Sequence, residues 1–214
     1  MPWSATSRYG LVPAPGALGL VQDLLNTAQA GHEPDLLADV ASARAWLREA
    51  TAEWSAATGR PGPEVVLDAG DLQELRVFRD DLREVTGRTG LHEETGRTGL
   101  HEVTGRADGA APGAGPAAPV LHTGAAVLEL GSDGSVRLRP EQTGQQELLA
   151  LVLAALYEGQ HAGTSHRLKN CRNSRCRVAF YDRSRNASGV WHSVRVCGNA
   201  INLRAHRERR RAAV

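Results

Sequence analysis

The chain has 214 residues, of which 41% are hydrophobic and 4% aromatic, and its formal net charge at pH 7 is +1. This length suffices for one ordinary domain and a small additional module. The longest apolar stretch, Leu148 to Tyr157, is too short to span a bilayer, and the chain does not begin with a basic segment followed by an apolar run. We therefore expect a cytoplasmic protein without a membrane partner.

The small net charge conceals two regions of opposite sign. Residues 161–214 contain 13 Lys or Arg and 2 acidic residues, a net charge of +11, whereas residues 1–160 contain 12 Arg and 22 acidic residues, a net charge of −10. Such asymmetry indicates a basic module for a polyanion and an acidic part with another role, although the two regions can also simply attract each other.

Apolar residues at helical spacing predict three helices before a repetitive segment. The first is expected over about 17–30, with Gly31 as its stop. The second opens at Pro34 and ends near the glycine- and proline-rich cluster at 59–63. Asp71 is expected to cap the third.

Residues 84–109 form a tandem repeat whose copies begin at Glu84, Glu93 and Glu102. Three copies are too few and too polar to build a solenoid core. A run rich in Gly, Pro and Ala follows at 107–119, so we expect a flexible insertion over about 84–119.

A hairpin and a buried helix are predicted after this insertion. Two alternating segments, Val127 to Leu130 and Val136 to Leu138, flank a turn-rich loop. The apolar stretch from Leu148 to Glu158 reads as a helix that packs into the core. The predicted fold class is α+β, with a mainly helical domain and its small β-hairpin over residues 1–160 and a small C-terminal module over residues 161–214.

The module over residues 161–214 contains a cluster of cysteine and histidine residues. All three cysteines of the chain lie there, as the pairs Cys171-x4-Cys176 and His192-x4-Cys197. Two short-spaced pairs joined by a longer loop are how a small module supplies the four tetrahedral ligands of zinc. The alternatives are a disulfide with a spare thiol, three unrelated buried cysteines, or a His192 that is only an ordinary polar residue.

Several observations favour a structural Cys3His zinc site. An odd number of cysteines without a secretory segment disfavours a disulfide framework, and no cysteine occurs in the first 170 residues. The module has few large apolar residues, and a structural zinc contributes on the order of 10 kcal/mol to small fingers. Four protein ligands leave no position for water, and we find no catalytic constellation elsewhere, so we expect no enzyme activity.

Further motifs follow in order: Phe180-Tyr181-Asp182, Ser184-Arg185-Asn186, Trp191 and Cys197-Gly198-Asn199. With the first cysteine pair, they resemble the CGNR zinc-finger family, which is named for a Cys-Gly-Asn-Arg motif at its last ligand. Two positions depart from that pattern. His192 stands where the family usually has cysteine, and Ala200 replaces the arginine of the motif.

The first region carries weaker motifs in Asp23 to Thr27, in Leu36 to Leu47 and in Leu72-x2-Leu75-Arg76. They resemble the ABATE domain that accompanies CGNR fingers. The resemblance implies a stress-induced bacterial transcription regulator whose first domain senses a small molecule or binds a protein. Asp23, Asn26 and Thr27 either line a pocket or form a helix cap and a polar face.

The chain after Cys197 predicts a helix with Asn199 as its cap and a cationic surface. Arginine suits bidentate contacts to phosphate or guanine, although a cationic run is often only a solvated tail. The predicted nucleic-acid contacts are Arg177, Arg183, Arg185, Arg204, Arg207, Arg210 and Arg211.

These features favour a DNA-binding transcription regulator with a structural zinc. The alternative is an RNA-binding or protein-interaction adaptor whose finger docks a partner. Binding to several phosphates weakens steeply with salt, whereas an apolar protein contact does not, so salt dependence separates the two. We find no heptad or other dimer signature, and the oligomeric state stays open.

Overall fold

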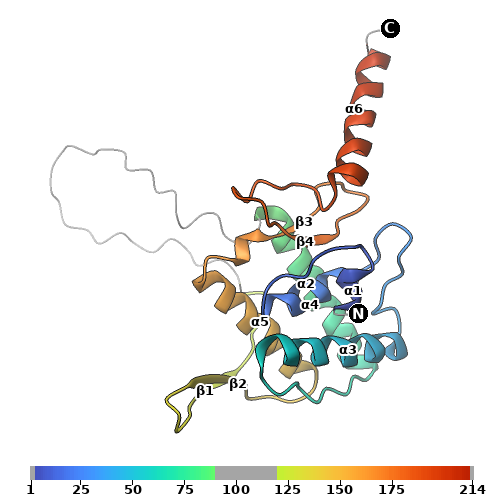
Figure 1. Ribbon diagram of the computed structural model, residues 1–214. Helices are drawn as coiled ribbons and strands as arrows, with labels where there is room; N and C mark the ends of the chain where they lie inside the picture. The colour runs from blue at the N-terminus through green and yellow to red at the C-terminus, as the bar shows by residue number, and fades with distance from the viewer. Residues whose placement is uncertain (1–2, 90–119, 213–214) are drawn as a thin grey trace, which may run out of the picture.

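A computed structural model describes residues 3–89 and 120–212 of the chain. In Figure 1 a body of helices lies below the C-terminal segment, and one long helix projects from the top of the molecule. The predicted α+β class is confirmed, because the helices are accompanied by two small antiparallel sheets. None of the described helices combines the length and the apolar character that a membrane span requires.

The body is built around helix α2 (Leu18–Asn26), every residue of which is buried. It is contacted by α1 (Ser4–Ser7), α3 (Val40–Thr58), α4 (Ala69–Thr89) and α5 (Gln145–His161). A helix that is apolar on most of its surface is stable only when other elements cover it. The central position of α2 therefore follows from its sequence.

Two predicted helix starts are wrong, and capping explains both. The second helix begins at Val40, because the Asp39 carboxylate accepts the Ser42 N–H at 2.9 Å and so fixes the first turn. The third begins at Ala69, where Asp68 and Asp71 each accept the backbone N–H of the other at 2.9 Å. This reciprocal pair is a capping box with Asp68, rather than Asp71, as the cap.

Helix α4 also extends into the predicted insertion. Residues 84–89 are helical, and the buried Thr86 hydroxyl donates to the Leu82 carbonyl at 2.7 Å. The first copy of the repeat therefore begins inside a helix. The remainder of the predicted insertion, residues 90–119, lies outside the described residues.

The predicted hairpin is confirmed as β1 (Ala126–Leu130) and β2 (Val136–Pro140), which pair antiparallel with Leu128 opposite Leu138. It extends away from the helices in Figure 1. The predicted apolar helix is also confirmed. It is α5, and its Leu148 and Val152 are completely buried in the core.

The C-terminal segment contains the 3₁₀ turn η1 (Ser165–Arg167), strands β3 (Leu168–Asn170) and β4 (Ala179–Tyr181), the π-helical turn η2 (Val194–Gly198) and helix α6 (Asn199–Ala212). The two strands pair antiparallel, and Leu168 and Ala179 belong to the same hydrophobic cluster as the body. The segment is thus anchored to the body through its strands.

Buried polar side chains of α2 make this junction specific. The Asn26 side chain accepts the Ala179 N–H at 2.8 Å and donates to the Ala179 carbonyl at 2.9 Å, so it pairs with β4 as a neighbouring strand would. Asp23 is fully buried and accepts hydrogen bonds from the Thr6 N–H and the Trp46 indole. Asp23, Asn26 and Thr27 therefore form internal ties.

Candidate metal centre

The four predicted metal ligands are brought together by the fold. Cys171, Cys176, His192 and Cys197 each offer one ligand atom, and these atoms all lie within 4.8 Å of one another. The His192 Nδ1 atom is 3.3 Å from the Cys176 sulfur and 3.6 Å from the Cys197 sulfur. Tetrahedral zinc, with bonds of about 2.3 Å to sulfur and about 2.0–2.1 Å to nitrogen, separates such ligands by about 3.6 Å. The donor set therefore fits a structural zinc ion.

The first ligand pair lies on a tight turn between β3 and β4. Cys171 follows β3 directly and donates its N–H to the Val178 carbonyl at 2.8 Å, which extends the strand pairing. The Asn173 carbonyl then accepts the N–H groups of both Cys176 and Arg177. Arg177 closes the turn in the left-handed region, at φ 55°. This turn directs both sulfurs to the same side.

The second ligand pair spans the π-helical turn. The Ser193 side chain accepts the Val196 N–H, and the Ser193 carbonyl accepts the N–H groups of Cys197 and Gly198. A Cβ atom at Gly198 would lie 3.2 Å from the Trp191 ring, so a larger residue would crowd the indole. Helix α6 continues from this turn without a break, so Asn199 has helical dihedral angles and is not the predicted cap.

The pKa values of the three thiols are also those expected of a site that binds a cation. Hydrogen bonding with Cys176, aided by the His192 side chain and by the backbone N–H groups of His192 and Asn173, lowers the pKa of Cys171 to about 3. The pKa of Cys176 is raised, first by its hydrogen bond with Cys171 and then by burial, and burial raises the pKa of Cys197. One thiolate thus opposes the ionisation of the others. A bound dication removes this opposition, because metal ligation requires all the thiols deprotonated.

Residues around the ligands hold the site in shape. The buried Asn173 side chain lies 3.4 Å from the Cys197 sulfur and donates to it. Such outer contacts orient ligands and tune their basicity. The sequence prediction missed Asn173, although an amide residue inside a Cys-x4-Cys spacing is a signal that can be read.

The loop between the ligand pairs is tied by Asp182. Its buried carboxylate accepts the N–H groups of Ser184 and Gly189, and the ammonium of Lys169 lies 2.9 Å away. Burial alone would raise the pKa of Asp182, but hydrogen bonds from Ser184, Lys169 and Gly189 outweigh it and hold the pKa well below its usual range. Asp182 and Ser184 are therefore structural ties of this loop.

Residues 167–210 match the CGNR zinc finger family. The matched segment starts before β3 and reaches into α6, so it includes all four ligands of the Cys3His cluster. The match supports the resemblance for this finger and leaves residues 1–166 unassigned. No curated protein matches the chain.

The predicted nucleic-acid contacts have different surroundings. Arg177 lies between the finger and the body, where its carbonyl accepts a hydrogen bond from Arg83. Arg183 packs over the Tyr181 ring and donates to the Pro13 carbonyl at 2.7 Å, whereas Arg185 is exposed on the loop. The others lie on α6, where Arg204 is half-buried and Arg207, Arg210 and Arg211 are exposed. Their role in binding stays a prediction.

Proposed function

We propose that this chain is a DNA-binding transcription regulator in which the zinc finger presents α6 to DNA. The observation that carries the proposal is the placement of α6. In Figure 1 this helix stands clear of the body, and its packing against the rest of the described chain is chiefly against η2. Because η2 contains the ligand Cys197, the metal fixes the direction in which α6 leaves the finger.

The charge of α6 suits a polyanion. Residues three or four apart share a helix face, so Arg204, Arg207 and Arg211 lie on one side. Arg210 lies beside this face, whereas Arg209 lies on the opposite side. A helix of this length is marginal alone in water, and cations in its last turn favour its dipole, so the arginines also help the helix to form. An exposed cationic helix is of a size to enter the major groove.

In this proposal zinc is structural and the chain is not an enzyme, because protein side chains fill all four tetrahedral positions. The body is the regulatory part of a cytoplasmic protein. Its motifs resemble the ABATE domain, and that resemblance is the support for a stress-responsive sensor or partner-binding role. The ties from Asn26 to Ala179 offer a physical route from the body to the finger.

The test is the anisotropy of a labelled duplex titrated with zinc-loaded protein over a series of salt concentrations. We expect the logarithm of affinity to fall linearly with the logarithm of salt concentration, with a slope of about −0.9 for each phosphate neutralised. Replacing both Arg207 and Arg211 with Ala should make the slope shallower by about one for each phosphate that is no longer neutralised. Arg209→Ala is the matched control on the opposite face. Binding that is absent, or independent of salt and of these substitutions, would contradict the proposal.

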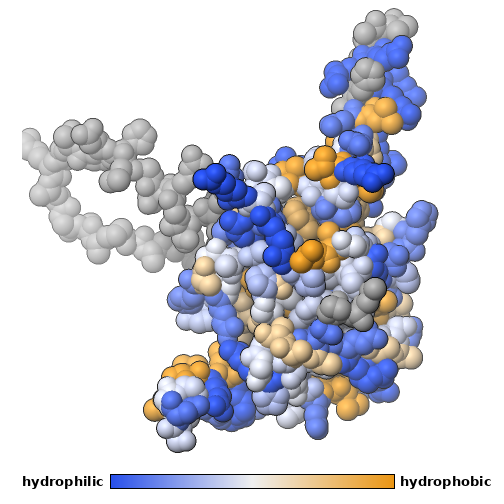
Figure 2. All heavy atoms as spheres, in the orientation of Figure 1, coloured by the Kyte–Doolittle hydropathy of each residue, from blue (hydrophilic) through white to orange (hydrophobic). Residues whose placement is uncertain are grey.

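One observation favours a protein-interaction adaptor as the second candidate. Val194, Val196 and Leu203 expose half or more of their surface at the base of α6. Apolar residues gather there beside strongly hydrophilic ones in Figure 2. Contiguous exposed apolar surface often marks a protein contact. If the adaptor function holds, Val196→Ser should abolish association with a protein partner at high salt while Arg207→Ala leaves it unchanged.

A further inference from the structure

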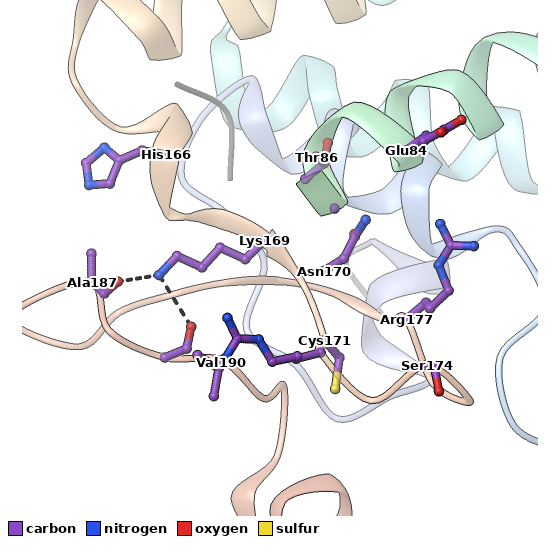
Figure 3. Close-up of a pocket in the computed structure, with 13 residues that line it drawn as sticks. Glu84, Thr86, His166, Lys169, Asn170, Cys171, Ser174, Arg177, Ala187 and Val190 are labelled. Atoms are coloured by element: carbon purple, nitrogen blue, oxygen red, sulfur yellow. Dashed lines mark hydrogen bonds between the residues drawn. The ribbon is translucent and has the colours of Figure 1, made fainter. Parts of the chain in front are cut away.

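A cleft of about 760 Å³ lies where the end of α4 meets the finger (Figure 3). Ligand sites in proteins usually measure about 300–1,000 Å³, so this cleft is of a size to hold a small organic molecule. One wall is formed by the end of α4 and the other by β3, the first cysteine turn and the loop that Asp182 ties. Lys169, Asn170, Arg172 and Arg177 line the finger side, and Glu84 lines the α4 side.

Two guanidinium groups of this cleft have no acceptor among the described residues. The side chains of Arg172 and Arg177 are exposed and make no hydrogen bond or ion pair with the described part of the chain. Lys169 differs, because its ammonium is held by Asp182 and by the carbonyls of Ala187 and Gly189. The two arginines are therefore the cations that remain available to a ligand.

The charge beneath the cleft is also positive. Arg83 lies behind the wall and donates to the Arg177 carbonyl at 3.1 Å. Burial, followed by repulsion from Arg177 and Arg79, lowers the pKa of Arg83. Glu84 is the one acidic residue among the described residues of the wall, and in Figure 3 its carboxylate points away from Lys169 and Asn170. An anion in the cleft would relieve this repulsion between arginines.

The cleft also contains a buried acceptor without a donor. The Asn170 amide donates to the Arg83 carbonyl at 2.7 Å, but its Oδ1 atom is buried without a hydrogen-bond partner. An unsatisfied buried acceptor costs about 1–3 kcal/mol, which a ligand hydroxyl or amino group would recover. The cleft is thus suited to a ligand with an anionic group near the arginines and a hydrogen-bond donor near Asn170.

We propose that this cleft binds a small phosphorylated metabolite that carries hydroxyl or amino groups and is about the size of a nucleoside monophosphate. One of the forked guanidinium groups of Arg172 and Arg177 binds the phosphate, for which its geometry is suited, and the other adds positive charge to the cleft. A hydroxyl or amino group of the ligand donates to Asn170 Oδ1 when this side chain turns toward the cleft, because the atom is buried in the structure. These three residues belong to the finger, and the end of α4 forms the opposite wall, so a ligand in the cleft lies between the body and the finger without requiring any role of α6.

Calorimetric titration of the full-length zinc-loaded chain tests this site, with adenosine monophosphate, ribose 5-phosphate and inorganic phosphate as separate probes. We expect the first two to bind more tightly than inorganic phosphate, because only they also reach Asn170. Arg172→Gln and Arg177→Gln should each weaken binding about tenfold, the effect of losing one hydrogen bond to a charged group. Arg195→Gln, an exposed arginine of η2 outside the cleft, is the matched control and should bind as the wild type does.

Zinc content is measured for each variant, so that damage to the neighbouring metal site is recognised. The same variants are titrated with duplex DNA, because a DNA backbone supplies the same phosphate chemistry. If Arg172→Gln weakens DNA binding and none of the free phosphates binds the wild type, the metabolite site is overturned. Equal weakening by Arg195→Gln would overturn it as well. None of the three titrations with free phosphates depends on the DNA-binding proposal, so the two proposals fail separately.

Discussion

Leu24 in the middle of the body and Cys197 in the middle of the finger are both almost completely buried, but different interactions hold them there. Around Leu24, helices α1 to α5 bury leucines and tryptophans in one apolar cluster. Around Cys197 the neighbours are metal ligands and polar ties, such as Asn173 and the Asp182 network. The body is thus stabilised by burial of apolar surface, and the finger by ligation and hydrogen bonding.

This difference separates what each part needs in order to fold. We expect the body to fold by burial of its own apolar surface and the finger to require a metal ion, because the apolar residues of the finger are few. The two parts are not fully separate, since Leu168 and Ala179 of the finger strands belong to the body's hydrophobic cluster. We expect β3 and β4 to remain attached to the body when the metal is lost.

The largest effect is expected for Cys171→Ala. Removing this ligand should abolish zinc binding and with it a contribution of about 10 kcal/mol to the order of the finger. Hydrogen exchange should show protection lost from Arg183 to Gly198 and retained in β3, β4, α2 and α3. Ser174→Ala, an exposed change on the same turn, is the control. Equal loss of protection in α2 would mean that body and finger form one folding unit.

Leu24→Ala should destabilise the body by about 2–5 kcal/mol, because the substitution leaves a cavity in a fully buried site. Urea unfolding followed by circular dichroism measures this loss, with Val66→Ala as the exposed control. Zinc bound per chain should stay unchanged under native conditions. A loss of zinc in Leu24→Ala would show that the finger's metal site depends on the packing of the body.

Asp182→Asn should destabilise the finger by about 3 kcal/mol, because Lys169 then faces no carboxylate in a largely buried position. Since the folded state depresses the pKa of Asp182, its contribution is complete above the ordinary aspartate pKa and declines as pH falls through the folded value. The stability difference from the wild type should therefore be largest near neutral pH and shrink below about pH 4. The rates of amide hydrogen exchange in β3 and β4, measured over a pH series, give this stability difference.

The control for this change is Asp133→Asn, which alters an exposed carboxylate at the tip of the hairpin. It should leave exchange in the finger unchanged. A difference between Asp182→Asn and the wild type that grows as pH falls would contradict the assigned role of the carboxylate.

The smallest effect is expected for Asn26→Ala, at the junction of the two parts. It removes both bonds between the Asn26 side chain and Ala179. The buried Ala179 N–H is left unpaired and its carbonyl keeps only the 3.4 Å bond from Gln22, at a cost of about 1–3 kcal/mol. Exchange of the Ala179 amide should accelerate while zinc content stays the same. If that amide is unaffected, the polar clamp does not hold the finger to the body.

The metal site was predictable from the sequence because its signal is local. Two Cys or His pairs at matched spacing specify two turns, and the structure brings all four ligands together. The hairpin was predictable for the same reason, from alternating residues on both sides of a turn. The start of α3 was not predictable. Leu36 and Leu37 fit the apolar spacing of the helix, but the Asp39 cap starts the helix after them, at Val40.

Contacts between distant parts of the chain could not be predicted. Asn26 and Ala179 are 153 residues apart, and nothing in either local pattern pairs them. The π-helical turn that displaces Asn199 from the cap position depends on the hydrogen bonds of Ser193. The cleft between α4 and the finger likewise exists only once the two parts are packed together.

The most direct test of the account is the amount of zinc bound per chain in protein purified without added metal. The account predicts about one zinc ion for the wild type and its loss or marked weakening in His192→Ala, because His192 supplies the fourth ligand. A well-folded wild-type protein without zinc, or a His192→Ala variant that holds zinc as tightly as the wild type, would contradict the Cys3His centre.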